Sequence, residues 1–271
     1  DPLGMSQEDP TIVVTPIRKD MFIGGAGIVA AHASGLGAMV KYYGVIGDDE
    51  TADYVKNSIK THRVESRLFE DEGRVTTLKQ RYRSRGKTLL RVSHLHQHEI
   101  SNELAINILQ NLEQDIKSAD LLVFSDFNYG CLPQYLVDEI MKLCREHAVP
   151  MAADSQSSSQ FGDISRYKGM ILVTPTEHEA RLAVRDKDLG LAALAQALRE
   201  KSGTKNIFIT LGGEGLLVEA ESAPKEAIVT DQLPAFNLAP KDVAGAGDSL
   251  LISAAMALVV GATGWEAAYL G

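Results

Sequence analysis

The chain has 271 residues, 45% hydrophobic residues and a formal net charge of −9, which argues against nucleic acid or an anionic membrane as a partner. Its two cysteines, Cys131 and Cys144, exclude a disulfide framework and suit a reducing compartment, so we expect a cytoplasmic location. The longest apolar run, 250–260, is too short to cross a bilayer. Because the chain opens with Asp1 and stops within what reads as a new helix, we expect a trimmed or partial protein.

The first third of the chain is predicted to mix strands with short helices. A β-hairpin or a pair of edge strands is predicted over 11–23, on either side of the charged turn Arg18-Lys19-Asp20. Glycines at positions 24, 25 and 27 open a helix of small residues over 28–34. The remaining elements predicted here are a strand over 40–46, a helix over 51–61, and two strands over 75–83 and 88–92 joined by a turn at 84–87.

From residue 100 onward, amphipathic helices alternate with short apolar strands. The predicted helices cover 101–117, 133–147, a segment beginning near Thr176, and 190–201. The predicted strands cover 121–124, 150–153, 170–173 and 207–209. This alternation is typical of a parallel sheet covered by helices on both faces, so we predict an α/β fold.

Each of these strands ends in a polar or glycine-rich step. The steps are Ser125-Asp126, Asp154-Ser155, Thr174-Pro175-Thr176 and Thr210-Leu211-Gly212-Gly213-Glu214-Gly215. Any one of them alone is ordinary loop chemistry. Ligands of an open parallel sheet bind beyond the carboxyl ends of its strands, however. Four such steps on one rim predict a cleft for a phosphate-bearing nucleotide and a polar co-substrate.

A glycine-rich stretch near the end of the chain leads directly into an apolar helix. The backbone N–H groups of Gly245, Ala246 and Gly247 are predicted to gather at the helix N-terminus, which is an anion-binding arrangement. Asp248 follows them, and a carboxylate facing a phosphate indicates a base for a hydroxyl that is about to be phosphorylated. The alternative is an aspartate that only complements the helix dipole.

Two motifs of the predicted cleft have simpler structural interpretations. Thr176-Glu177-His178-Glu179 has the spacing of a helix capping box, and contact with a metal or nucleotide is the second interpretation. The glycines between Thr210 and Leu216 suit a hairpin turn, and they also let backbone approach a triphosphate; both interpretations can hold together.

Two clusters in the 75–98 region are also open to two interpretations. His94, His96 and His98 share a face if the chain is extended, but no carboxylate stands at ligand spacing, which favours a solvated strand exit over a metal site. Arg81 and Arg83 share a strand face. They either protect an edge strand from aggregation or grip a phosphorylated substrate.

The residues at 242–249, Asp-Val-Ala-Gly-Ala-Gly-Asp-Ser, resemble the second signature of the PfkB (ribokinase-like) carbohydrate kinases. Gly24-Gly25-Ala26-Gly27, followed by Gly44 and Gly47-Asp48-Asp49, resembles the first. The resemblance spans nearly the whole chain and is closest to the kinase domain of the bifunctional ADP-heptose synthases. It implies one domain over 1–271, a three-layer α/β/α sandwich with a mostly parallel sheet, and lid strands at 11–23 and 75–93. It also implies that the first strand and the C-terminal helices of the family are missing.

The resemblance implies a role for each matching residue. Asp248 is the expected catalytic base, with Gly245, Ala246 and Gly247 as the anion hole. The expected ATP-binding residues are Thr210, Gly212, Gly215, Thr176 and Asp242, and those expected to organise Mg²⁺ are Glu179 and Asp242. The expected substrate-binding residues are Gly24, Gly25, Asp126, Arg81 and Arg83. The lid strands are expected to pair two copies into a homodimer.

The sequence departs from the family pattern where the family has asparagines and lysines. Ile28 and Thr176 stand at asparagine positions, and Tyr129 and Gln156 stand near lysine positions. These departures leave room for a weakly active relative that only binds nucleotide or sugar. The expected reaction is ATP-dependent phosphorylation of a sugar hydroxyl, on a sugar phosphate such as heptose 7-phosphate or on ribose, fructose, fructose phosphate or adenosine. A rival interpretation, a nicotinamide-dependent dehydrogenase, rests on the G-x-G-x-x-A match at 25–30 but lacks a buried strand before it.

Overall fold

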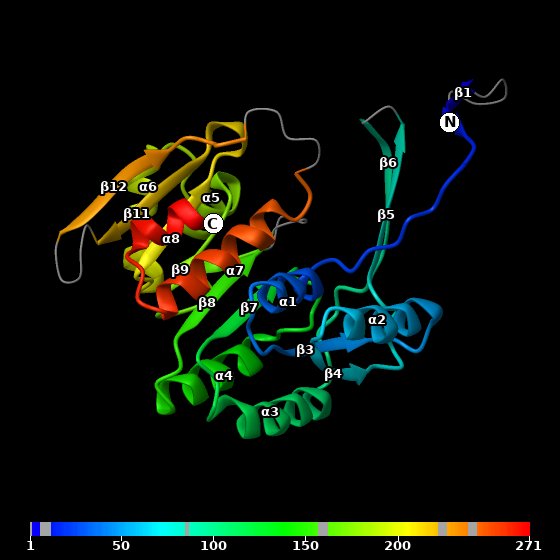
Figure 1. Cartoon of the computed structure of the whole chain (residues 1–271), viewed down its shortest axis with the longest axis horizontal. Coiled ribbons are helices and arrows are strands. Elements are labelled where there is room, and N and C mark those ends of the chain that lie inside the picture. The colour runs from blue at the N-terminus through cyan, green and yellow to red at the C-terminus, as the bar shows by residue number, and fades with distance from the viewer. Residues whose placement is uncertain (1, 6–11, 85–86, 157–161, 222–226, 238–242) are drawn as a thin grey trace.

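The fold is a three-layer α/β/α sandwich with a two-stranded ribbon extending from it (Figure 1). The structure is a computed structural model that describes residues 2–5, 12–84, 87–156, 162–221, 227–237 and 243–271. The central sheet has the strand order β12-β11-β10-β9-β8-β7. These are Ile228–Leu233, Leu216–Glu221, Asn206–Thr210, Leu172–Val173, Met151–Ser155 and Leu122–Asp126.

Strands β7 to β10 are parallel, whereas β11 and β12 continue the sheet in antiparallel pairing. The sheet is therefore mostly parallel, as predicted, with an antiparallel edge. The hairpin between β10 and β11 confirms the turn interpretation of the glycines after Thr210. Gly215 has φ of 98°, and a Cβ there would lie 2.1 Å from the carbonyl oxygen of Leu233. Only glycine fits such a turn.

Successive residues of the buried strands contribute to different layers. Ala153 and Val173 belong to one core, and their neighbours Ala152 and Leu172 belong to the other. This is the period of two expected for strands with helices on both faces. The first core is covered by α3, α4, α5 and α6, which are Asn102–Ile116, Gln134–Glu146, Glu177–Val184 and Leu191–Ser202. The second is covered by α1, α7 and α8, which are Ala26–Gly35, Ala246–Val259 and Gly264–Leu270.

Two smaller sheets lie beside the sandwich. β3 (Lys41–Ile46) pairs in parallel with β4 (Glu65–Glu70), and α2 (Glu50–Thr61) connects them. β5 (Leu78–Ser84) and β6 (Lys87–His94) form the predicted antiparallel ribbon, which stands away from the body of the molecule (Figure 1). No helix in the described part of the chain is long and apolar enough to cross a membrane.

The prediction of a hairpin within 11–23 is wrong. β2 (Ile12–Val14) pairs with the preceding β1 (Pro2–Met5), and residues 15–24 form no strand. Pro16 lacks the N–H that would extend β2, and Phe22, at 82% exposure, finds no partner strand. Since no strand leads directly into Gly25, residues 15–24 forming none, the dinucleotide-binding interpretation of 25–30 also loses the element that it requires.

Candidate active site

The polar strand ends predicted to form one rim do lie along neighbouring strands. Asp126 and Ser155 are register partners at the ends of β7 and β8. Thr176, just beyond β9, forms an isolated parallel bridge with Thr210, the last residue of β10, and the Thr210 N–H donates to the Pro175 carbonyl over 2.9 Å. The predicted nucleotide-binding threonines therefore lie side by side, whereas Asp126 lies at the opposite end of the parallel section.

Asp248 occupies the first turn of α7, where it is buried. Gly245 caps this helix with φ of 85°, a left-handed conformation that favours glycine. The Asp248 side chain is 7% exposed, and its Oδ1 atom is buried without a hydrogen-bond partner among the described residues. An unsatisfied buried carboxylate oxygen is costly, which favours a functional purpose over mere dipole complementation.

The other members of the predicted anion hole contribute unequally. The Ala246 N–H donates to the Val243 carbonyl over 3.2 Å, which commits that amide to a turn in this conformation. A Cβ added at Gly245 or Gly247 would meet nothing within 4 Å, so the backbone there is open to close approach. Asp242, predicted at the phosphates and metal, lies outside the described residues.

Three carboxylates interact electrostatically at the centre of the rim. Burial raises the pKa of Asp154 well above its usual value, and the charges of Glu179 and Asp248 raise it further. Burial also raises the pKa of Asp248, while the positive charges of His32 and Lys79 offset part of that shift. Negative charge is therefore disfavoured at this position, and a cationic ligand would stabilise the ionised carboxylates.

Glu179 and Thr176 form the predicted capping box. The Glu179 Oε2 atom accepts from the Thr176 N–H over 2.8 Å and from the Thr176 Oγ1 over 2.9 Å, and the Thr176 Oγ1 accepts from the Glu179 N–H. The structural interpretation of this motif is thus confirmed. It fixes the Glu179 side chain, which is buried, at the N-terminus of α5.

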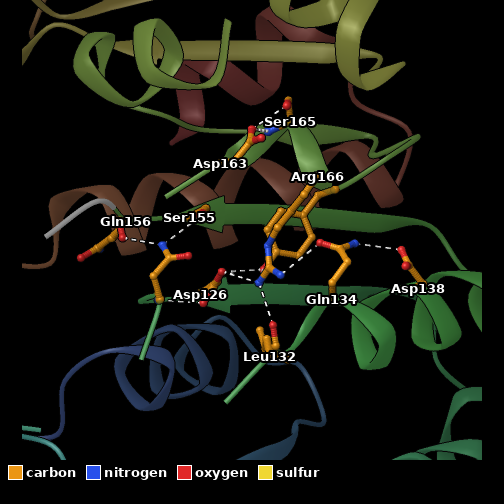
Figure 2. A network of polar contacts seen from close by, with 11 residues as sticks. Asp126, Leu132, Gln134, Asp138, Ser155, Gln156, Asp163, Ser165 and Arg166 are labelled. Atoms are coloured by element: carbon orange, nitrogen blue, oxygen red, sulfur yellow. Dashed lines mark hydrogen bonds and ion pairs between the residues drawn. The ribbon is translucent and has the colours of Figure 1, made fainter. Parts of the chain in front are cut away.

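On the side predicted to bind the sugar, Gly25 and Asp126 lie in different environments. Gly25 caps α1 with φ of 57°, and a Cβ there would lie 3.2 Å from the Phe127 ring. Asp126 is 5% exposed, and both of its carboxylate oxygens accept hydrogen bonds from neighbouring groups of the protein (Figure 2). Its Oδ2 accepts from Arg166 over 2.7 Å and from the Tyr167 hydroxyl over 2.8 Å.

Asp126 also shapes the loop that follows it. Its Oδ1 atom accepts from the Asn128 N–H over 2.8 Å, and Asn128 adopts φ of 57°. The Asn128 side chain then donates to Ser155 and to the Gln156 carbonyl (Figure 2). These contacts indicate that Asp126 holds this loop in place. Gly24, the other residue predicted on the sugar side, is exposed and has open space around it.

The predicted arginines lie on the exposed ribbon. Arg81 and Arg83 are both exposed on β5, and Arg81 is the direct register partner of Arg91 on β6. Like charges opposite one another destabilise a strand pair unless an anion lies between them. His96 and His98 also lie near one another, with ring centroids 5.1 Å apart. However, the described residues contain no group of three or more His, Cys, Asp or Glu side chains that could hold a metal ion.

Sequence reasoning did not identify several residues that the structure brings to the site. Arg166 and Tyr167 lie 40 and 41 positions from Asp126, and no local pattern marks them. Lys79 on β5 and His32 on α1 act electrostatically on Asp248. A signal existed only for Asn128, because asparagine tolerates left-handed backbone better than most residues.

Three comparisons with known proteins agree. Residues 5–271 match the model of the pfkB family carbohydrate kinases. The "Bifunctional protein HldE" of Desulfatibacillum aliphaticivorans is 31% identical over 263 residues, which cover 96% of this chain and 52% of that protein. The protein of the same name from Paramagnetospirillum magneticum is 28% identical over 98% of this chain and 54% of its own length. The chain thus spans about half the length of these curated relatives.

Solved structures share the fold at lower identity. Phosphofructokinase-2 from Escherichia coli, in complex with substrates and products, superposes with a TM-score of 0.73 over 97% of this chain and 83% of its own, at 17% identity. A PfkB protein from Polaromonas sp. JS666 gives a TM-score of 0.69 over 90% of this chain and 80% of its own, also at 17% identity. These likenesses confirm the predicted fold class.

Proposed function

The chain belongs to the pfkB family of carbohydrate kinases, and we propose that it transfers the γ-phosphoryl group of ATP to a hydroxyl of a sugar phosphate such as heptose 7-phosphate. The observation that carries the proposal is the buried Asp248 carboxylate, which has an unpartnered oxygen in the first turn of α7. A base poised at a helix N-terminus suits a reaction between a hydroxyl and a phosphate.

In the proposed reaction, Asp248 accepts the proton of the acceptor hydroxyl as that oxygen attacks the γ-phosphorus. A new oxygen–phosphorus bond forms, the bond to the bridging oxygen of ATP breaks, and ADP leaves. The N-terminus of α7 faces the charge that develops on the phosphoryl oxygens. Thr210, Thr176, Gly212 and Gly215 are the proposed contacts of the nucleotide.

A divalent cation, which we take to be Mg²⁺, fits the electrostatics of this rim. The charges of Glu179 and Asp248 both raise the pKa of Asp154, so a cation is favoured there, and Mg²⁺ is usually held by only one or two carboxylates together with substrate phosphates and water. Glu179 and Asp242 are the residues proposed to hold it. When bound, the ion would neutralise charge on the nucleotide phosphates.

The preference for an anionic acceptor rests on the ribbon. Arg81 and Arg83 are proposed to hold the phosphate of the acceptor, with Gly24 and Gly25 beside the sugar. The name of the curated relatives, a bifunctional protein, fits a kinase half joined to a second activity. We also propose that two copies pair through their ribbons, because Leu89 and Leu90 are exposed on β6 and a lone two-stranded ribbon is marginally stable in water.

The test is ATP turnover against heptose 7-phosphate, fructose phosphates, ribose, fructose and adenosine. We expect turnover with a sugar phosphate, and Asp248→Asn to lower kcat by about 10²–10⁴-fold while ATP binding stays within a few fold. Asp231→Asn, a change on exposed β12, is the matched control and keeps wild-type turnover. Near-normal turnover in Asp248→Asn would refute the assignment of the base. If ATP binds but no acceptor reacts, the chain is a binding relative.

A further inference from the structure

Arg74 is a buried arginine at the base of the ribbon, in the segment between β4 and β5. Its side chain is 3% exposed, and each of its three guanidinium nitrogens has an acceptor. Nη1 donates to the Tyr129 carbonyl over 2.6 Å, Nη2 to the His98 carbonyl over 2.7 Å, and Nε to the Asp71 carboxylate over 3.2 Å. The donors diverge from one planar group, so the compact ammonium of a lysine could not reach all three acceptors.

These acceptors belong to three separate segments of the chain. Asp71 lies in the connection that leads into β5, and His98 lies in the connection that leaves β6. Tyr129 lies in the 126–130 loop, which follows β7 on the side of the site predicted to bind the sugar. Arg74 therefore joins both connections of the ribbon to this loop. Because the ribbon stands away from the body of the molecule (Figure 1), its connections determine its direction.

Close backbone contacts pack the base of the ribbon against the body. The Gly47 N–H donates to the Thr76 Oγ1 over 2.9 Å. A Cβ at Gly47 would lie 2.2 Å from the Arg74 carbonyl oxygen, and a Cβ at Gly130 would lie 2.0 Å from the His98 carbonyl oxygen. Backbone at such distances has little room to move while the contacts of Arg74 hold.

The inner end of the ribbon contacts the same loop. The Lys79 Nζ atom lies 4.9 Å from the ring centroid of Phe127 and 5.1 Å from that of Tyr129. A cation is attracted to ring faces at such distances. Arg74 thus holds the backbone of the 126–130 loop at Tyr129, while β5 contacts its aromatic side chains. The ribbon and the loop form one joint, and Arg74 is the buried residue at its centre.

We propose that Arg74 is a positioning residue for the sugar-phosphate acceptor, because it holds the ribbon that carries Arg81 and Arg83 at a fixed angle to the 126–130 loop. The proposal rests on the proposed function, since it takes those two arginines as the contacts of the acceptor phosphate. Groups that are already in place bind a ligand more tightly than groups that the ligand must order. The predicted nucleotide-binding threonines lie at the opposite end of the parallel strands, so ATP binding should not depend on Arg74.

The first experiment measures the angle of the ribbon without any turnover. Spin labels are attached at Thr88→Cys on β6 and at Lys142→Cys on α4, which are both exposed positions. The background carries Cys131→Ser, and the remaining native cysteine, Cys144, is buried. Pulsed electron–electron double resonance, with labelled protein diluted in excess unlabelled protein, then gives the distance within one chain. The unmodified joint should give a single narrow distance peak.

Three substitutions in this labelled protein test the role of Arg74. Arg74→Met keeps an apolar stem and removes the three donors, so we expect the single peak to be lost. Arg74→Lys keeps the charge but not the planar fork, and its distribution should lie closer to that of Arg74→Met than to that of wild type. Arg67→Met removes a half-exposed arginine on β4 that pairs with Glu65, and this matched control should keep the narrow peak.

The second experiment uses unlabelled protein and the best acceptor of the turnover panel. Arg74→Met should raise the acceptor KM by about tenfold, because two arginine side chains must then be ordered on binding, with kcat within about threefold of wild type. The Kd for ATP should stay within about twofold, and Arg67→Met should keep all wild-type values.

Two results would overturn the proposal. One is an unchanged distance distribution in folded Arg74→Met, and the other is a fall in kcat with the acceptor KM unchanged. If Arg74→Met does not fold, Arg74→Lys takes its place in both experiments, where a wild-type peak and a wild-type KM would count against the proposal in the same way. Failure of all acceptors would sink the proposed function, whereas the spin-label distances would still decide whether Arg74 holds the ribbon.

Discussion

Replacing Arg166 with methionine tests whether the network around Asp126 acts as one unit. The change keeps a long apolar stem and removes the guanidinium that donates to Asp126 over 2.7 Å and to the Leu132 carbonyl over 2.9 Å. The Asp126 carboxylate would keep only the Tyr167 hydroxyl and the Asn128 N–H. Its side chain is 5% exposed, so water cannot replace the lost partner.

The expected cost follows from this burial. Breaking a buried ion pair by removing one partner typically costs about 3–5 kcal/mol. A domain of this size loses roughly 2–4 °C in Tm for each kcal/mol, so the Tm should fall by about 6–20 °C. Asp126→Asn alone should cost a comparable amount, because the buried Arg166 guanidinium then loses its carboxylate partner. Its Nε atom already lacks a hydrogen-bond acceptor.

The free energy of unfolding of the double variant Arg166→Met with Asp126→Asn decides whether the network is coupled. Removing both charges leaves no buried ion, so the double variant should be more stable than the two single costs predict, by about 1–3 kcal/mol. Urea unfolding followed by circular dichroism and by the fluorescence of Trp265, the only tryptophan, gives the free energies. Single costs that add within about 0.5 kcal/mol would refute the view of one coupled network.

Two further predictions concern the rim. Gly215→Ala should cost about 2–4 kcal/mol and weaken ATP binding, because its φ is 98° and a Cβ would collide with the Leu233 carbonyl. Gly213→Ala, where a Cβ meets nothing within 4 Å, should cost under about 0.5 kcal/mol, and equal losses in thermal unfolding would contradict this. The raised pKa of Asp154 favours the folded state at low pH, and that contribution is lost as the pH rises through the folded-state pKa. Asp154→Asn should therefore match wild type in urea at pH 4 and gain about 1–3 kcal/mol by pH 8, and a difference independent of pH would be evidence against it.

The sequence predicted those parts of the fold that depend on local patterns. The alternating helices and strands after residue 100, the capping box at Thr176 and the start of α7 all follow from periodicity or from end signals within a few residues. β4 was missed because its sequence, Glu-Ser-Arg-Leu-Phe-Glu, has little apolar alternation, and it is stabilised by pairing with β3. The false hairpin within 11–23 shows the reverse, because the apolar residues at 21–23 have no strand to pair with.

The site shows the same division between local and distant signals. The position of Asp248 in the first turn of α7, after the capping Gly245, could be predicted because these residues are adjacent in the chain. The interaction of Asp126 with Arg166 could not, since it joins residues 40 positions apart through an irregular segment. The contact of Lys79 with the Phe127 and Tyr129 rings depends on how the ribbon lies against a loop, which no spacing within either segment encodes.

The alanines of α1 and α7 set how deeply Asp248 sits in the molecule. Ala254 and Ala255 are fully buried on α7, and Ala33 on α1 is buried in the same core cluster, where the two helices pack together. Helices with such small contact residues approach at the short end of the usual range of about 8–10 Å. One added methyl group at this contact would act as a wedge, tilting α7 and moving its N-terminus relative to the strand ends. The position of Asp248 relative to the strand ends is thus set by small residues in the contact between α1 and α7.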